Sequence, residues 1–275
     1  MSREILQDMA GIAGLFNVPH AAADCALLLH GLQHRGQDGV GIAVTDGETL
    51  RCYKRRGLLS ELLKAEPVQE SPGTAAIGQV RLRLEQDRMD ENLQPVMVRA
   101  YQGHFAIVST GMIENAAALR ESMENQGLIF QGLSDAEVIA HLIQRESGHL
   151  FEKITRACRQ MQGSWTFLLM TKSTLYAMRS VEGARSLFVA DVPSAPGGKA
   201  FATESGALSI LGAEHIRELE PGELLRFGKG SEGRWLLPAD GPCLGPCAME
   251  YVYFSRPDSV LSGRGVLGAR KAFGR

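Results

Sequence analysis

The sequence predicts an α+β fold in which hairpin-rich sheets pack against helices. Short strand-like runs come in bursts separated by turn residues, and they outnumber the helical segments. Strands and helices do not alternate regularly, which argues against a parallel βαβ sheet. A chain of 275 residues, 44% hydrophobic and 22% charged, is also long enough to bury a core without disulfides or metals.

The expected strands are rich in β-branched and aromatic residues and are bounded by residues that favour turns. In chain order they span Gly11–Asn17, Val40–Val44, Thr49–Tyr53, Ala75–Leu82, Phe105–Thr110, Trp165–Thr171, Thr174–Met178, Leu187–Asp191, Lys199–Thr203, Glu223–Phe227 and Met249–Phe254. The last of these is an aromatic strand, MEYVYF, and we expect it to pack against the core or against a partner.

The expected helices carry apolar residues at helical spacing on one face. They span His20–Gln33, Glu114–Glu124, a segment that begins after Ser134, and Leu150–Met161. The third is the clearest, because Ser134 and Glu137 have the spacing of a capping box ahead of an apolar face. Proline and glycine accumulate at 194–198, which indicates a loop tip, and at 237–247, which indicates the exit from the compact domain.

Charge and composition exclude several functional classes. A net charge of -2 gives no basic surface for nucleic acid or for an acidic membrane. The uncharged stretch from Met9 to His20 is shorter than the roughly 18–20 residues that a spanning helix needs. We therefore expect a cytoplasmic protein that binds neither nucleic acid nor membrane.

The cysteines do not predict a metal site or a disulfide framework. There are 5 of them, scattered along the chain, and Cys243 and Cys247 alone cannot complete a tetrahedral site. His30 and His34 have the spacing of a metal pair on a helix, but no third ligand is evident, so we expect structural roles for them. No metal and no cofactor are expected.

Five stretches of the sequence, taken together, are specific enough to indicate a protein family. They are LQHRGQDGVGI (32–42), SDAEVI (134–139), ATESGALSILGAE (202–214), RELEPGE (217–223) and CAMEYVYFSRPDS (247–259). In this order they resemble the N-terminal glutaminase domain of the glutamine phosphoribosylpyrophosphate amidotransferases, which begin purine synthesis. The resemblance runs from about Ala10 to the last residue.

The resemblance implies an N-terminal-nucleophile (Ntn) hydrolase-like fold, a four-layer αββα sandwich of two antiparallel sheets between helices. In that family an N-terminal cysteine, exposed by removal of a leader, attacks the glutamine amide with its own α-amine as base. An asparagine and a glycine N–H stabilise the oxyanion, and an arginine and an aspartate hold the amino-acid end of glutamine. Ammonia then passes to a phosphoribosyltransferase domain.

The nucleophile position departs from the family pattern. The family motif begins C-G-[IV]-x-G, whereas this chain reads Ala10-Gly11-Ile12-Ala13-Gly14. The oxyanion motif His-Asn-Gly is Ser109-Thr110-Gly111, and Arg-Tyr-Ser-Thr is Arg81-Leu82-Arg83-Leu84. A methyl group cannot attack a carbonyl, and the other two departures argue against a single engineered knockout. We expect a catalytically inactive relative, a pseudoenzyme with no intact catalytic residue.

The amino-acid end of the pocket is better retained. The resemblance assigns ligand-binding positions to Arg81, Asp135, Gly111, Arg35 and Gly36, and glutamine or a related amino acid is the expected ligand. Two of these have plainer interpretations. Arg81 could be a solvated strand-end arginine, and Asp135 could be a first-turn acid favoured by the helix dipole.

We expect three segments: a leader-like 1–9, a glutamine amidotransferase-like domain at 10–240, and an exit strand and tail at 241–275 that leads toward an absent phosphoribosyltransferase domain. Cys247 matches an iron–sulfur ligand of some relatives, but without the other ligands we expect a buried small hydrophobe there. A separate transferase subunit or a second copy of the chain is the expected partner. The alternative is an active glutaminase subunit for purine synthesis whose native residue 10 is cysteine.

Overall fold

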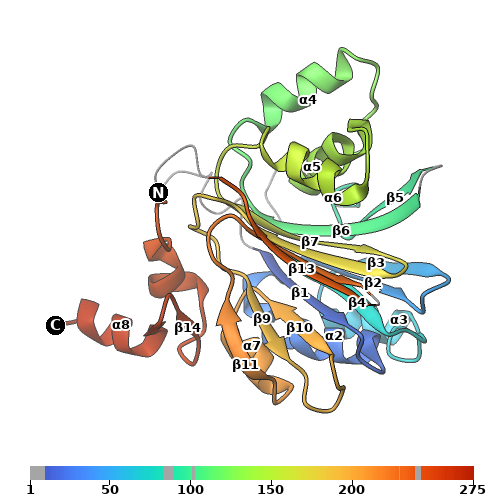
Figure 1. Ribbon diagram of the computed structural model, residues 1–275. Helices are drawn as coiled ribbons and strands as arrows, with labels where there is room; N and C mark the ends of the chain where they lie inside the picture. Colours follow the sequence, from blue (N-terminus) through green and yellow to red (C-terminus); the bar gives the residue numbers. More distant parts are fainter. Residues whose placement is uncertain (1–9, 83–89, 101–102, 229, 239–242) are drawn as a thin grey trace.

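The computed structural model describes residues 10–82, 90–100, 103–228, 230–238 and 243–275. Two antiparallel sheets lie face to face, and helices cover the outer face of each (Figure 1). This four-layer αββα arrangement confirms the predicted α+β, Ntn-like fold. The expected leader, residues 1–9, lies outside the described residues.

The first sheet has seven strands in the order β11-β9-β10-β1-β4-β2-β3. Its central strand β1 pairs with β4 on one side and β10 on the other, and both faces of β1 are buried. The strands span Ala10–Phe16 (β1), Gly39–Thr45 (β2), Leu50–Arg56 (β3), Ala75–Arg81 (β4), Phe188–Asp191 (β9), Lys199–Ala202 (β10) and Glu214–Glu218 (β11).

The second sheet has six strands in the order β13-β12-β8-β7-β6-β5. Its strands span Val96–Ala100 (β5), Gly103–Gly111 (β6), Trp165–Thr171 (β7), Thr174–Arg179 (β8), Glu223–Gly228 (β12) and Ser231–Leu236 (β13). All of its neighbouring strands run antiparallel, as the closely spaced strand predictions suggested.

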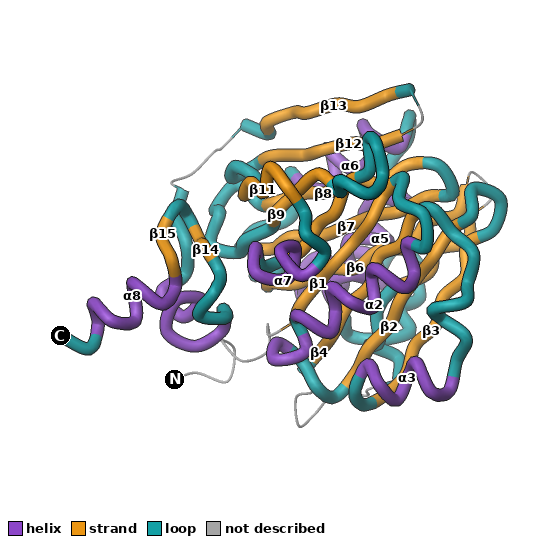
Figure 2. The backbone as a smooth tube through the Cα atoms, turned by 90° about the horizontal axis from the view of Figure 1, so that it is seen from below, coloured by secondary structure: helices purple, strands orange, loops and turns teal. Residues whose placement is uncertain are grey.

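Helices form the two outer layers. Figure 2 shows α2, α3 and α7 over the outer face of the first sheet, whereas α4, α5 and α6 lie over the second sheet in Figure 1. Their bounds are Ala21–Gly31 (α2), Leu59–Ala65 (α3), Ala116–Glu124 (α4), Asp135–Arg145 (α5), Leu150–Cys158 (α6) and Ser205–Ile210 (α7). A 3-10 turn, η1 (Gln33–Arg35), follows α2. Within the described part of the chain, no helix is both long and apolar enough to cross a membrane.

Each interface between layers has its own hydrophobic core. Leu28 and Leu29 of α2 are fully buried against the first sheet, and Ile12 and Leu168 are buried between the two sheets. A third core between the second sheet and its helices includes Phe167, with α5 residues Ile139 and Leu142. The strands near the middle of the sandwich are therefore buried on both faces and fix the position of their ends.

The capping box predicted for α5 forms only in part. The Ser134 hydroxyl accepts a hydrogen bond from the Glu137 N–H at 3.4 Å, as expected. The Glu137 carboxylate, however, accepts from the N–H groups of Gln131 (2.6 Å) and Gly132 (2.9 Å). The reciprocal half of the box is therefore wrong, because the acid stabilises the turn before the cap instead.

The predicted strand at Met249–Phe254 is wrong. Residues Glu250–Phe254 form a π-helical turn, η2, in which Glu250, Tyr251 and Phe254 are buried while Val252 and Tyr253 are exposed. A strand would place alternate residues on one face, whereas these buried positions have helical spacing. The inward carboxylate of Glu250, paired with arginines of the domain, is the physical reason.

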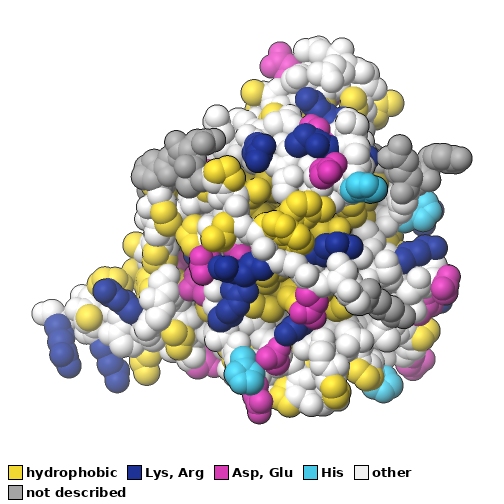
Figure 3. Space-filling model, in the orientation of Figure 1, with side chains coloured by type: hydrophobic (Ala, Val, Ile, Leu, Met, Phe, Trp, Pro, Cys, Tyr) yellow, Lys and Arg dark blue, Asp and Glu magenta, His cyan; other side chains and the backbone are white. Residues whose placement is uncertain are grey.

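The remainder of the C-terminal segment forms a small hairpin and a helix. These are β14 (Val260–Leu261), β15 (Arg264–Gly265) and α8 (Val266–Phe273). Tyr251, Leu261 and Val266 join the core beneath the first sheet, and the Tyr251 hydroxyl donates to the Leu261 carbonyl at 2.6 Å. The segment projects from the body at the left of Figure 3, with basic and hydrophobic side chains on its surface. Its expected role as an exit toward another domain stays a prediction.

Candidate amino-acid site and buried polar network

Residue 10 begins the central strand β1 and lies opposite Arg81, the last residue of β4. Ala10 is buried, with only 7% of its surface exposed. The Thr110 hydroxyl, at the end of β6, donates to the Ala10 carbonyl at 3.1 Å. Two predicted site positions from different sheets are thus brought together, and the hydroxyl of Thr110 contacts the main chain of residue 10.

Gly111 occupies a position that requires glycine. Its φ is +101°, and a Cβ there would lie 2.3 Å from the Ser164 carbonyl oxygen and 2.6 Å from Trp165 Cα. The residue ends β6 beside the Ala10–Thr110 contact. Close packing is therefore sufficient to account for the glycine, and its role as an oxyanion donor stays a prediction.

Two buried amides that the sequence interpretation missed hold the end of β6. Gln79 donates to the Ser109 carbonyl at 2.7 Å, and Gln94 accepts from the Ser109 N–H at 2.6 Å. Both glutamine side chains are buried. Only one signal was present in the sequence: Gln79 is a polar residue among the small and apolar residues at 75–80.

Arg81 and Asp135 approach the site from different layers. Arg81 donates from Nη1 to the Asn92 carbonyl at 2.7 Å, which fixes the direction of its side chain. Asp135 is the first residue of α5, and its Oδ2 accepts from the Ile113 N–H at 2.8 Å. Burial raises the pKa of Asp135, and the positive charge of Arg81 is the weakest of three effects that oppose this rise.

Burial nevertheless dominates the ionisation of Asp135. Loss of solvent raises the pKa of its carboxyl from 3.8 to about 6, against the opposing effects of the Ile113 N–H and of two arginines. One of these is Arg120 on α4, which the sequence interpretation did not single out. The Arg120 guanidinium lies 4.0 Å above the Phe130 ring and donates to the Gly132 carbonyl at 2.9 Å.

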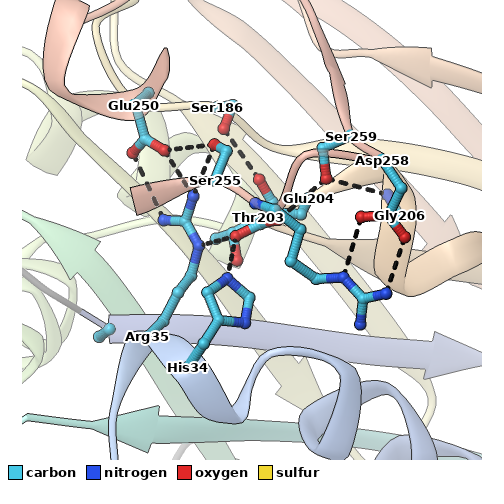
Figure 4. A network of polar contacts seen from close by, with 12 residues as sticks. His34, Arg35, Ser186, Thr203, Glu204, Gly206, Glu250, Ser255, Asp258 and Ser259 are labelled. Atoms are coloured by element: carbon cyan, nitrogen blue, oxygen red, sulfur yellow. Dashed lines mark hydrogen bonds and ion pairs between the residues drawn. The ribbon is translucent and has the colours of Figure 1, made fainter. Parts of the chain in front are cut away.

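Arg35 belongs to a buried ionic network beside this site (Figure 4). Its Nε donates to Glu204, and its Nη2 donates to Glu250 at 2.5 Å and to the Ser255 hydroxyl at 3.2 Å. Arg185 also donates to Glu250, at 3.2 Å. The Arg35 guanidinium is thus directed at acids of the α7 N-terminus and of η2.

The arginines lower the pKa of both carboxyls in this network. The pKa of Glu204 falls to about 2, because Arg35 and His34 outweigh the effect of burial. The pKa of Glu250 is lowered for the same reason by Arg35 and Arg185. His34 contacts Glu204 at 2.7 Å, which agrees with the structural role expected for it.

Gly36 joins the network to Arg81. A Cβ on Gly36 would lie 2.3–2.5 Å from the backbone atoms of Arg81, so the two backbones are in contact. The Asp38 N–H donates to the Arg81 carbonyl at 3.0 Å. The QHRG phrase therefore forms a support for Arg81, and direct ligand contact by Arg35 or Gly36 stays a prediction.

Neither histidines nor cysteines form a metal site in the part of the chain that the structure describes, where no group of three His, Cys, Asp or Glu side chains could hold an ion. Cys25 and Cys158 are buried, and burial raises the pKa of both thiols. Cys247 is only partly buried, so the prediction of a buried small hydrophobe there is wrong.

Comparisons with known proteins identify relatives of this chain. The family model described as "Glutamine amidotransferase domain" matches residues 80–209. Amidophosphoribosyltransferase from Bacillus subtilis is 38% identical over 276 residues, which cover 98% of this chain and 56% of the relative. A relative of the same name from Staphylococcus aureus strain MRSA252 is 36% identical and is covered to 54%. The chain thus spans about half the length of the curated relatives it matches.

Solved structures give the same result. The glutamine phosphoribosylpyrophosphate amidotransferase of B. subtilis, solved with ADP and GMP, superimposes with a TM-score of 0.89 at 36% identity, covering 96% of this chain and 57% of that one. A class-II domain protein from Silicibacter pomeroyi, at 16% identity and a TM-score of 0.56, covers 83% of this chain and 100% of that one and shares the fold alone. The chain therefore contains a match to the glutamine amidotransferase domain and, over nearly its whole length, is homologous to the N-terminal glutamine amidotransferase part of amidophosphoribosyltransferase.

Proposed function

We propose that this glutamine amidotransferase domain does not hydrolyse glutamine and acts by binding an amino acid or a partner chain. The buried methyl group of Ala10, where the resemblance places the nucleophile, is the observation that carries the proposal. A methyl group can neither attack the amide carbonyl nor form a thioester. The domain would therefore be a pseudoenzyme.

The contact of Thr110 supports the same proposal. Where the resemblance implies an amide donor for the oxyanion, the chain has a shorter hydroxyl that donates to the Ala10 carbonyl. Loss of one such donor slows active enzymes by about 100- to 1,000-fold. Restoring a thiol at residue 10 alone would leave this second defect in place.

Arg81 and Asp135 support retention of amino-acid binding. A guanidinium and a carboxylate at these two positions match the α-carboxylate and α-ammonium of a free amino acid in charge. With a pKa of about 6, Asp135 would be mostly ionised at neutral pH and able to accept from an ammonium group. We propose glutamine or a related amino acid as the ligand.

The test measures glutamate release and ligand binding on the same preparation. We expect the pure chain to release no more glutamate from glutamine than a heat-treated control does. Isothermal titration should detect binding of glutamine or glutamate to the chain. Arg81→Ala and Asp135→Ala should each abolish the titration signal. Glutamate release that follows the protein through every purification step would overturn the proposal of inactivity.

A second candidate function is an active glutaminase subunit for purine synthesis. It is favoured by Arg81 and Asp135, because an active glutaminase would need the amino-acid-binding groups that the resemblance places at these positions. Sequencing of the natural gene decides between the two, because this candidate requires a cysteine codon at residue 10. An alanine codon there eliminates it.

A partner chain is the third part of the proposal. The relatives extend well beyond the matched region, since this chain covers 56% of the B. subtilis protein and 54% of the S. aureus protein. We propose that a separate transferase subunit or a second copy of the chain associates with the domain. Light scattering with the purified native assembly should show a mass above 29.8 kDa, whereas the monomer mass would contradict association.

A further inference from the structure

We propose that Arg35 is a positioning residue whose ion pairs with Glu204 and Glu250 hold Arg81 in place through Gly36. In this arrangement the C-terminal segment, residues 249–275, sets how well the amino-acid site binds. The inference rests on the amino-acid site proposed above. It adds that residues 249–275, which contribute none of the proposed ligand-contacting groups, control the affinity of that site.

The first step is the strength with which Arg35 is held. It is 4% exposed, and its carboxylate partners Glu204 and Glu250 are each 1% exposed. Both Nη atoms of Arg35 reach Glu250, at 2.5 and 3.4 Å. Without Glu250, Arg35 would keep only the Glu204 carboxylate at its Nε, and a buried guanidinium that loses one of two carboxylate partners is held less firmly in its position.

The second step is the contact from Arg35 to Arg81. Gly36 follows Arg35 directly, and its backbone lies against that of Arg81 closely enough to exclude a Cβ. The loop is held on its other side by Gln33, whose side chain donates to the Gly36 carbonyl at 2.5 Å and accepts from the Leu59 N–H at 3.0 Å. A shift of Arg35 therefore moves the backbone that supports Arg81.

The third step is the dependence of both acids on the C-terminal segment. Glu250 lies on η2 within that segment, and the Ser255 hydroxyl donates to it at 2.9 Å. Glu204 accepts from the Arg256 N–H and from the Ser259 hydroxyl, both at 2.9 Å (Figure 4). A partner that moves residues 250–259 would therefore change the partners of Arg35 at both carboxylates.

The test uses the full chain with Glu250→Gln, and with Ser255→Ala as a milder variant if the first fails to fold. Hydrogen–deuterium exchange is measured without ligand, and glutamine and glutamate are titrated separately. We expect faster exchange in residues 33–38 and 79–81. We also expect the dissociation constant for the amino acid to rise about fivefold or more, since fivefold is the lower end of the coupling usually found between two sites.

Glu223→Gln is the matched control. Glu223 is also a buried carboxylate held by two arginines, Arg217 at 2.7 Å and Arg234 at 2.7 Å, but it lies on β12 away from the QHRG loop. This variant should leave exchange at 33–38 and 79–81 and the ligand affinity unchanged. Equal effects in both variants, or no effect of Glu250→Gln and Ser255→Ala, would overturn the positioning role.

The two proposals fail separately. If the unmodified chain binds neither amino acid, the proposed ligand function is wrong, and exchange at 79–81 still decides whether the network positions Arg81. If the unmodified chain binds and Glu250→Gln binds equally well with unchanged exchange, the site stands and the positioning role is wrong.

Discussion

Single residues account for the ionisation of the candidate site. Burial raises the pKa of Asp135 from 3.8 to about 6, so between these values the folded chain keeps a proton that the unfolded chain releases. The carboxyl therefore disfavours folding increasingly as the pH rises through this interval, and the effect is complete above about pH 6.

Asp135→Asn should consequently stabilise the protein at neutral pH. The asparagine keeps an oxygen for the Ile113 N–H and has no charge to desolvate, so we expect a gain of about 2 kcal/mol at pH 7 and none below pH 4. Urea unfolding of both proteins across this range measures the difference. Equal stability at pH 7 would show that the carboxyl is not desolvated as the structure indicates.

Gly36 is a residue whose absence of a side chain matters. Because a Cβ would lie 2.3–2.5 Å from Arg81 backbone atoms, Gly36→Ala should lower the free energy of unfolding by about 3 kcal/mol. The control is Gly268→Ala on α8, where a Cβ meets nothing within 4 Å and helix propensity favours alanine by up to about 1 kcal/mol. Thermal unfolding of the pair measures both; similar effects would contradict the close contact at Gly36.

At the scale of elements, the sequence predicts most of the buried strands and the helices α2, α4, α5 and α6, but it misses α3, α7, α8 and the edge strand β5. The expected strand at Trp165–Thr171 and β7 coincide, and α5 begins directly after Ser134 as expected. Edge strands were missed: β11 (EHIRE) and β13 (SEGRWL) are charged and largely exposed, so they lack the apolar alternation that identifies a strand. Their positions depend on pairing with β9 and β12, which no local pattern records.

The η2 turn shows why an aromatic run can mislead. MEYVYF has high strand propensity, but the ion pairs of Glu250 with the domain determine the backbone instead. Phe254→Ala should lower stability by about 3–5 kcal/mol, because this ring is 2% exposed. Tyr253→Ala, at a residue 63% exposed, should change it by less than about 0.5 kcal/mol. Chemical denaturation compares the stabilities of the two variants. In a strand, Val252 and Phe254 would share a buried face, so a loss of stability at Val252 as large as that at Phe254 would contradict the helical turn.

For the whole molecule, the buried network predicts a specific sensitivity to acid. The folded-state pKa of Glu204, about 2, lies below its ordinary value of 4.5, so its contribution to stability is present above about pH 4.5 and is lost as the pH falls through 2. Glu204→Gln should be less stable than the unmodified chain by about 3 kcal/mol at pH 7, with the difference disappearing near pH 2. Circular dichroism during acid titration and urea unfolding measure it, and a constant difference at all pH values would contradict this origin.

The candidate site could be predicted only in part from the sequence. The positions of Ala10, Thr110, Arg81 and Asp135 followed from the resemblance. The structure places Ala10 in contact with Thr110 and opposite Arg81, and the charge of Arg81 has a small effect on Asp135. The supporting groups could not be predicted, because Gln79, Gln94 and Arg120 are defined by contacts between segments distant in sequence. The ion-pair partners of Arg35 could not be predicted either, because nothing in the sequence near QHRG indicates Glu204 or Glu250.

The Arg35 network also has a consequence for how the chain is made. Arg35 is synthesised early, but its partners Glu204 and Glu250 follow 169 and 215 residues later. During vectorial synthesis the loop beneath Arg81 must wait, with the Arg35 guanidinium still hydrated, until residue 250 has left the ribosome. The network therefore closes only after every strand of the two large sheets has been synthesised, so a nascent chain that stops before Glu250 would have these sheets but not the completed support of its candidate site.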